Sequence, residues 1–420
     1  MKHINITLLF LLFTLVSYTQ NLSNDPYSRF GLGDLYHSYT ATASGMGSVG
    51  VGLTNPLMIN HNNPASYSLI YKQRFIMQTG LYHVTNEMKV SNSDIEKSQI
   101  TNFSNLSHFN IAFPIAKWWG GSIGLLPYST FSYSFSDKHE NPSADLFFKG
   151  NGGLNRFYIG HSIKPHKNFS LGVNINYMFG KLSTERKVIF QDQSLLNSKQ
   201  IENTRVKGFY YDFGALFNNK IGEFNLTIST NIDNGNSISA KKTIFSETFR
   251  LNTLGSEITE DDSLSTSISG EIILPKAFSS GFSLYNDKLL FAFDYSLENW
   301  TKFKIFDQVD DNLDNSSRIA MGFQYVPDRK AINKYFKMIR YRIGIYSSKT
   351  HLNLRDQHLN EQVFSFGFGL PLKRTGALLN ISAELGKRGT TENNLIQDQF
   401  ARFKFGLILS DIWFIKRKYD

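Results

Sequence analysis

Histidine and serine are the side chains of this sequence that could carry out acyl transfer. His83, His108 and His161 lie in or beside segments of alternating hydrophobicity. A hydrolase would also need a serine and an orienting polar residue close to one of these rings. Nothing in the sequence places a nucleophile beside any of the three histidines, so we expect a protein that is not an enzyme.

Metal and thiol chemistry are disfavoured as well. The chain has no cysteine, which excludes disulfides, thiolate metal sites and a lipidated N-terminal cysteine. No pair of histidines has the spacing of a metal-ligand motif. One aspartate-rich segment lacks the spacing of a calcium-binding loop, so we expect a solvated loop there and neither a metal nor a cofactor. Its members are Asp307, Asp310, Asp311 and Asp314.

Three glycines imitate a nucleotide-binding motif. Gly45, Gly47 and Gly50 have the spacing G-x-G-x-x-G, but no strand precedes them and no βαβ unit surrounds them, so we reject that function. They lie in residues 21–73, which are rich in Gly, Asn, Ser and Pro and show no hydrophobic alternation. Long irregular segments of this kind are either functional or disordered.

The composition excludes two broad classes of protein. The 420 residues include 44 Lys and Arg against 35 Asp and Glu, which gives a formal net charge of +9. Aromatic residues make up 14%, which argues against disorder, and the charged fraction of 19% is below the roughly 25% of a soluble domain. The mean hydropathy is nevertheless negative, −0.26, which a helical membrane protein would not show.

From about residue 74 onward, large apolar residues alternate with small or polar ones. Phe291, Phe293 and Tyr295, for example, alternate with Ala292 and Asp294. A period of two indicates β-strands. The second face is mostly Gly, Ala, Ser and Asn, whereas the water-exposed face of a soluble sandwich normally carries Lys, Glu and Thr. The pattern therefore predicts an all-β fold, a transmembrane antiparallel β-barrel, with a soluble sandwich as the alternative.

Connection lengths predict about 14 strands. Six connections are short and seven are long, and they alternate along the chain, as periplasmic turns and external loops do in such barrels. An even count places both chain ends on the periplasmic side. Residues 222–286 could hide a further hairpin, which would give 16 strands. The predicted strands are residues 74–91, 106–116, 120–136, 154–164, 168–190, 205–219, 222–235, 267–286, 288–300, 316–327, 338–349, 361–372, 376–388 and 400–415.

The first residues resemble an export signal. A short basic start precedes an apolar run over residues 4–16, which is followed by small and polar residues 17–20. The run is shorter than the roughly 20 residues that a membrane-spanning helix needs. Residues 1–20 are therefore predicted to be a secretory signal peptide, with 74–420 as the barrel.

Residues 21–73 are predicted to form an N-terminal hatch, a plug inside the lumen. A barrel of 14 strands has a lumen wide enough to leak unless something fills it. Glycines would let the backbone of the plug pass close to the wall. A flexible periplasmic tail is the alternative.

This stretch resembles the hatch of the long-chain fatty-acid transporter (FadL) family of outer-membrane proteins. That family has a run of Ala and Gly, a variable piece and then Asn-Pro-Ala. Residues 121–128, 274–301 and 383–389 also resemble family segments, in family order, whereas the chain end at Asp420 is not the aromatic residue of many such barrels. The matching hatch residues are Ala43, Gly45, Gly47, Gly50, Asn63, Pro64 and Ala65.

The resemblance implies passive uptake of hydrophobic molecules such as long-chain fatty acids. In that family the ligand enters from outside, rests in apolar pockets, passes when the hatch shifts, and leaves sideways through a gap in the wall. A gap needs a break in the strand ladder. Pro127 cannot donate a ladder hydrogen bond, and Gly124 has no side chain to block an opening. We therefore predict a lateral opening at Gly124 and Pro127, with a strand bend or bulge as the alternative.

Location and partners follow from the same interpretation. We expect the outer membrane of a Gram-negative bacterium, with outer-membrane lipid and hydrophobic small molecules as partners, and no nucleic acid. The alternative function is a secretion-system or surface-assembly barrel that handles protein cargo, similar to the type IX secretion shuttle protein. Its partners would be periplasmic or secretion-system proteins.

Overall fold

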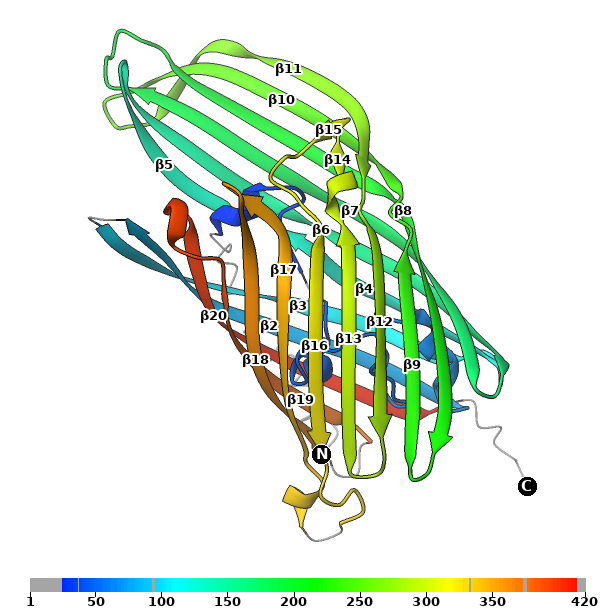
Figure 1. Cartoon of the computed structure of the whole chain (residues 1–420). Helices are drawn as coiled ribbons and strands as arrows, with labels where there is room; N and C mark the ends of the chain where they lie inside the picture. The colour runs from blue at the N-terminus through cyan, green and yellow to red at the C-terminus, as the bar shows by residue number, and fades with distance from the viewer. Residues whose placement is uncertain (1–24, 37, 93–94, 332–333, 373–375, 414–420) are drawn as a thin grey trace, which may run out of the picture.

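Fourteen long antiparallel strands close into a barrel in the computed structural model, which describes residues 25–413 except 37, 93–94, 332–333 and 373–375 (Figure 1). The predicted signal peptide lies outside the described residues. Each wall strand pairs with its two neighbours, and β2 with β20 closes the circle. The predicted count of 14 is confirmed. The wall strands are β2 (Arg74–Asn92), β3 (Ile95–Pro114), β4 (Trp119–Thr130), β6 (Ser143–His166), β7 (Phe169–Phe190), β8 (Asn197–Ile221), β9 (Phe224–Asp233), β12 (Lys276–Tyr285), β13 (Leu289–Asn299), β16 (Ser316–Tyr325), β17 (Arg340–Leu354), β18 (Gln357–Pro371), β19 (Leu378–Arg388) and β20 (Ile396–Ile412).

The hidden hairpin exists, but it does not add strands to the wall. β10 (Ser237–Leu251) and β11 (Glu257–Ile273) form a hairpin that pairs with the outer half of β8 and lies above the barrel (Figure 1). The prediction of one strand over residues 267–286 is therefore wrong. The strand is interrupted at residues 274–275, because Pro275 cannot donate a backbone hydrogen bond.

Several smaller elements lie at the same end of the barrel as the β10–β11 hairpin. The predicted strand 120–136 is likewise divided, since β4 ends before β5 (Tyr133–Glu140), which pairs with β6. We call the end of the barrel that carries β5 and the β10–β11 hairpin the long edge. The opposite end, where short turns join the strands, is the short-turn edge. The other small elements at the long edge are β14 (Lys304–Ile305), β15 (Gln308–Val309), η3 (Trp300–Lys302) and η5 (Glu392–Asn394), whereas η4 (Tyr335–Lys337) lies between β16 and β17 at the short-turn edge.

The alternation places apolar side chains outside and small or polar ones inside. Phe291 of β13 and Phe323 of β16 are 37% and 39% exposed, whereas their strand neighbours Ala292 and Gln324 are buried. An outward apolar face with a polar interior is the arrangement of a transmembrane barrel. No helix in the described part of the chain is long and apolar enough to cross a membrane.

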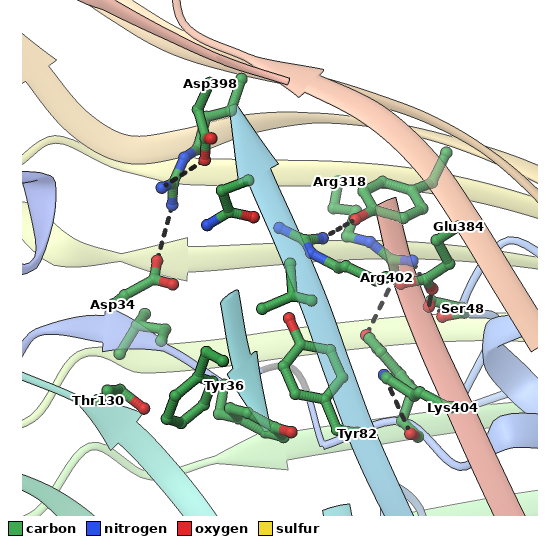
Figure 2. Close-up of a pocket in the computed structure, with 17 residues that line it drawn as sticks. Asp34, Tyr36, Ser48, Tyr82, Thr130, Arg318, Glu384, Asp398, Arg402 and Lys404 are labelled. Carbon is green, nitrogen blue, oxygen red and sulfur yellow. Dashed lines mark hydrogen bonds and ion pairs between the residues drawn. The ribbon is translucent and has the colours of Figure 1, made fainter. Parts of the chain in front are cut away.

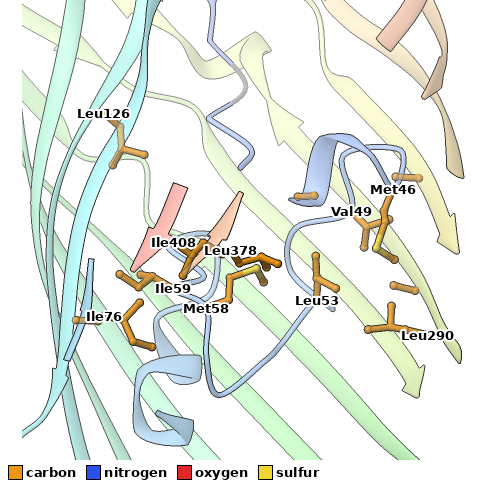
Figure 3. Packing of buried hydrophobic residues seen from close by; sticks show 14 of the residues in the cluster. Met46, Val49, Leu53, Met58, Ile59, Ile76, Leu126, Leu290, Leu378 and Ile408 are labelled. Atoms are coloured by element: carbon orange, nitrogen blue, oxygen red, sulfur yellow. The ribbon is translucent and has the colours of Figure 1, made fainter. Parts of the chain in front are cut away.

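The described residues from 25 to 70 lie inside the barrel (Figure 1). They contain η1 (Pro26–Arg29), β1 (Asp34–Leu35), α2 (Ala41–Ser44) and η2 (Pro64–Leu69), joined by irregular backbone. We call residues 25–70 the N-terminal segment. Its apolar side chains pack against those of the wall, and each such buried side chain contributes roughly 1.5–3 kcal/mol relative to exposure. Figure 3 shows Met46, Val49, Leu53, Met58 and Ile59 of the segment with Ile76, Leu126, Leu290, Leu378 and Ile408 of the wall.

Candidate functional site

One buried carboxylate of the wall binds the backbone in the middle of the N-terminal segment. Asp294 is on the inward face of β13 and is 2% exposed. Its Oδ2 accepts hydrogen bonds from the backbone N–H groups of Gly50 (2.5 Å) and Val51 (2.7 Å), and its Oδ1 accepts one from Gly52 (2.9 Å). Consecutive N–H groups that converge on a carboxylate stabilise its charge away from water.

Two further charged residues hold the turn just before this point. The Nη2 of Arg318, on β16, donates to the carbonyl oxygens of Gly47 (2.8 Å) and Ser48 (3.0 Å). The Ser48 hydroxyl donates to Oε1 of Glu384, on β19, at 2.6 Å. Because these groups are buried, each hydrogen bond is stronger than it would be in water.

Glycines allow the backbone of the N-terminal segment to contact the backbone of the wall strands. Gly47 has a φ of +69°, a conformation that glycine adopts without strain. A Cβ on Gly344 of β17 would collide with the backbone of Met46 and Gly47, and one on Gly367 of β18 would lie 3.0 Å from the Cα of Gly45. The predicted hatch residues Gly45 and Gly47 thus lie where wall glycines leave room for them.

The Asn-Pro-Ala motif caps η2 and contacts a different part of the wall. The side-chain oxygen of Asn63 accepts the N–H of Ala65 (3.0 Å), and Pro64 occupies a first-turn position where its missing N–H costs nothing. The hydroxyl of Ser162, on β6, donates to the carbonyl of Ala65 at 2.8 Å. A Cβ on Gly172 of β7 would collide with Pro64 and Ala65, so this motif also needs a wall glycine.

At the long edge an arginine ties the start of the segment to the wall. Arg388 of β19 donates from Nη2 to Asp25 (2.6 Å) and Asp398 (3.2 Å), and from Nη1 to Asp34 (2.7 Å). The Asp25 and Asp398 side chains are 4% exposed, whereas that of Asp34 is 43% exposed. Burial raises the pKa of Asp25, and the guanidinium of Arg388 opposes this rise.

A small amphipathic pocket lies between the segment and the wall (Figure 2). Tyr36 and Tyr82, whose ring centroids are 4.8 Å apart, and Phe103 provide its aromatic side. Arg402 and Lys404 provide basic groups, and Arg402 is bonded to Glu361 at 2.6 Å. The pocket encloses about 50 Å³, which is room for only a few water molecules.

The wall ladder between β3 and β4 stops part-way. These strands pair from Pro114 with Gly120 to Phe109 with Leu125. Beyond that point β3 continues on β2 and β4 continues on β6, and no further β3–β4 pair occurs among the described residues. Pro127 lies two residues past the last pair.

The N-terminal segment covers the edge of β4 that β3 leaves. Within β1, Leu35 pairs with Ser129 of β4, and the Ser38 hydroxyl donates to the carbonyl of Pro127 at 2.9 Å. In a strand the N–H and C=O of one residue point to the same side. This regular arrangement does not hold at Pro127, because the β4–β6 register shifts between Pro127 and Ser129, so the structure contains the strand irregularity that was the alternative at this position.

Gly124 lies one residue before the end of the ladder, and its inner side is occupied. It pairs with Asn110, and a Cβ there would collide with Asn110 and Tyr158. The Asn110 amide is 3.2 Å from Nδ1 of His61, whose Nε2 contacts the carbonyl of Ser38. Burial, followed by the charge of Arg156, lowers the pKa of His61 well below its usual range, so the ring is neutral.

The predicted histidines lie apart from one another. His83 lies 2.8 Å from the Ser104 hydroxyl on the neighbouring strand, a contact that sequence spacing did not reveal. The other nitrogen of this ring faces the Thr85 hydroxyl at 3.5 Å, where a catalytic triad would have a carboxylate. His161 accepts from Trp119. Among the described residues, no group of three His, Asp or Glu side chains is placed to hold a metal ion.

Sequence reasoning missed the buried charges of the lumen, although a signal for them exists. Each occupies the inward phase of a strand, where small residues predominate, and a charge on that face needs a partner inside the barrel. These residues include Asp294, Arg318, Glu361, Glu384, Arg388 and Lys404, and Arg402 beside them is partly buried.

Solved structures share this architecture. A Pseudomonas aeruginosa FadL homologue matches with a TM-score of 0.59 and 13% identity, over 89% of this chain and 98% of that one. The P. putida toluene transporter TodX matches with a TM-score of 0.58 and 15% identity, over 91% of this chain and 100% of that one. The Ralstonia pickettii toluene transporter TbuX matches with a TM-score of 0.54 and 10% identity, over 89% and 98%. At these identities the likeness shows the fold alone.

Sequence comparison identifies the family. No curated protein matches the chain. A family model, that of BamG, matches residues 1–420, the whole length of the sequence. The chain therefore belongs to the BamG family, and its fold is a 14-stranded barrel like that of FadL and TodX.

Proposed function

We propose that this protein is an outer-membrane channel for the passive uptake of hydrophobic molecules, such as long-chain fatty acids. The observation that carries the proposal is the incomplete β3–β4 ladder. The N-terminal segment covers the edge of β4 that β3 does not reach. If the segment moves, the wall beside Pro127 loses its only described cover on that edge. An apolar molecule could then leave sideways into lipid, where it partitions favourably.

The N-terminal segment acts as the hatch in this proposal. The side chains of the segment pack against those of the wall across the lumen, so in this proposal passage requires the segment to shift. The hatch residues Gly45, Gly47, Gly50, Asn63, Pro64 and Ala65 would set its resting position through their contacts with the wall.

The chemistry of the pocket supports an amphipathic cargo. The aromatic rings of Tyr36, Tyr82 and Phe103 suit an acyl chain, and the basic groups of Arg402 and Lys404 suit a carboxylate head. The aromatic and the basic side chains lie beside the edge of β4 that β3 does not pair with.

Replacing Pro127 by valine tests the lateral opening. Valine restores a backbone N–H just past the point where the β3–β4 ladder ends, and this donor favours extra pairing and a tighter wall. We expect uptake of labelled oleate by intact cells to fall severalfold, while the amount of heat-modifiable barrel stays unchanged. Pro114→Val, at the short-turn end of β3, is the matched control. Unchanged uptake in Pro127→Val would contradict the proposed lateral opening at Gly124 and Pro127.

A second candidate function is a secretion or surface-assembly role with protein partners. It is favoured by a concave, mainly apolar surface on the outside of the wall, lined by residues of β16 to β20 and of β2 and β3. The surface includes Ile319, Met321, Ile345, Phe364 and Leu385. If this function holds, crosslinkers at Phe364 should capture a membrane protein in cells, and Pro127→Val should leave that capture and fatty-acid growth unchanged.

A further inference from the structure

The outer surface of β7 and β8 carries an apolar band of defined height. Outward residues alternate over nine positions of β7, 171 to 179, and nine positions of β8, 209 to 217. A strand tilted by about 45° needs roughly 9–11 residues to cross the hydrocarbon core. The band therefore accounts for the full membrane thickness. Its members are Leu171, Val173, Ile175, Tyr177 and Phe179 on β7, and Phe209, Tyr211, Phe213, Ala215 and Phe217 on β8.

Basic residues follow the band on its long-edge side. The next outward residue of β7 is Lys181, and the next two of β8 are Lys207 and Arg205. Lys241 of β10 continues the row. We call Lys181, Arg205, Lys207 and Lys241 the basic patch, and all four are exposed.

Strand register brings these four side chains together. Lys181 is directly opposite Arg205, and Arg205 is directly opposite Lys241, so three positive charges stand in one row across three strands. Neighbouring strands are about 4.8 Å apart, so the row spans about 10 Å between its outer Cα atoms. Lys207 lies two residues from Arg205 on the same face, about 7 Å along the strand.

Nothing within the described chain neutralises the patch. None of its members forms an ion pair or a side-chain hydrogen bond with a described residue. Like charges directly opposite each other on a sheet are destabilising, so the row has a cost that an external anion would remove. Elsewhere on the same sheet, lysines are paired: Lys187 and Lys199 both contact Glu257, and Lys242 contacts Glu202.

Aromatic rings form the end of the apolar band that adjoins the basic patch. Tyr177 lies opposite Phe209, with ring centroids 5.0 Å apart, and Phe179 lies opposite Lys207. Aromatic side chains of this kind mark the level of lipid headgroups. The basic patch is therefore at the height of headgroup phosphates, on the external side if the short turns are periplasmic.

We propose that the basic patch binds the phosphate groups of a lipid in the outer leaflet. Arg205 is central in the row and can hold a phosphate oxygen pair through two parallel N–H bonds. The lysines on either side add further charge, and the acyl chains of the same lipid lie along the apolar band below. The inference uses the outer-membrane location proposed above but does not depend on hatch movement or transport.

The test is lipid binding by the purified full-length protein. The probes are diphosphorylated lipid A, the same lipid after removal of both phosphates, and inorganic phosphate. Binding is measured by native mass spectrometry and by a fluorescent-lipid titration. We expect the protein to bind diphosphorylated lipid A in preference to the dephosphorylated form, and inorganic phosphate to compete only weakly.

Charge-removing variants locate the binding. Near a surface each basic residue contributes roughly fivefold to the binding of an anionic lipid. Replacing all four patch residues by glutamine should therefore weaken binding by roughly tenfold to several hundredfold. The matched control replaces four exposed lysines of the short turns, Lys117, Lys167, Lys220 and Lys288, and should bind as the wild type does.

Three results would overturn the proposal. One is unchanged lipid binding in the four-residue variant, and another is equal binding of the dephosphorylated lipid. The third is tight binding of inorganic phosphate that depends on the same four residues, which would identify a site for a free anion. If the four-residue variant does not assemble, Arg205→Gln and Lys207→Gln replace it singly, and wild-type affinity in both rejects the site.

Discussion

Replacing Asp294 by alanine is expected to release the middle of the N-terminal segment from the wall. The change removes the acceptor of three backbone hydrogen bonds, from Gly50, Val51 and Gly52. A hydrogen bond to a charged group contributes roughly 1.5–3 kcal/mol, and because all three share one carboxylate we expect a total loss of about 4 kcal/mol. The apolar contacts of Met46 and Leu53 would remain, so the segment should loosen locally while the barrel stays assembled.

Hydrogen exchange measures this release directly. The amides of residues 50–52 should exchange roughly a thousandfold faster in Asp294→Ala than in the wild type, which corresponds to about 4 kcal/mol. Liposomes that contain the variant should also swell faster in small sugars. Asp294→Asn keeps one acceptor oxygen and should give an intermediate rate.

Asp287→Ala is the matched control for this experiment. Asp287 is exposed in the turn between β12 and β13, on the same hairpin as Asp294. It should change neither the exchange of residues 50–52 nor the swelling rate. Wild-type protection of these amides in Asp294→Ala would show that the carboxylate does not hold the segment.

The barrel itself could be predicted from the sequence because its determinants are local. Alternation along each strand follows from the pleat, and the difference between short and long connections follows from the two sides of a membrane. The β10–β11 hairpin could not be placed in the same way. Its residues also alternate, and only its pairing with the outer half of β8 shows that it lies above the wall.

The contacts that hold the segment could be predicted only in part. The glycines of the segment, such as Gly45 and Gly47, predicted a close approach to the wall, because a residue without a side chain has this effect locally, whereas Asn63-Pro64-Ala65 was identified only by its resemblance to a family motif. Their partners could not be predicted, since Asp25 and Arg388, for example, are 363 residues apart and meet only after the barrel closes. Pro127 marked the disturbed strand, but the end of the ladder depends on how β3 and β4 diverge.

Replacing Arg388 by methionine is expected to detach the start of the N-terminal segment. Methionine fills much of the same volume but leaves the buried carboxylates of Asp25 and Asp398 without their common partner. Removing one member of a buried ion pair typically costs about 3–5 kcal/mol. Limited proteolysis should therefore cut near residues 25–35 in the variant and spare them in the wild type.

Acidic pH should partly reverse the effect of Arg388→Met. Burial already raises the pKa of Asp25, and the positive charge of Arg388 is the largest influence that opposes this rise, so removing it should raise that pKa further. A group whose pKa is higher in the docked state favours docking while it is protonated, and this contribution is lost as the pH rises through the docked-state value. Protection from protease should thus be greater near pH ~5 than near pH ~8 in the variant.

Two comparisons separate this charge effect from general destabilisation. Lys387→Met changes the preceding residue of β19, whose exposed side chain points outward, and should leave proteolysis at wild-type levels at both pH values. Arg388→Lys retains the positive charge but loses the fork that reaches three carboxylates, so it should give intermediate protection. If Arg388→Met were as protected as the wild type at neutral pH, the arginine would not be what ties Asp25 to the wall. The segment would then be held mainly by Asp294 and by the apolar contacts beneath it.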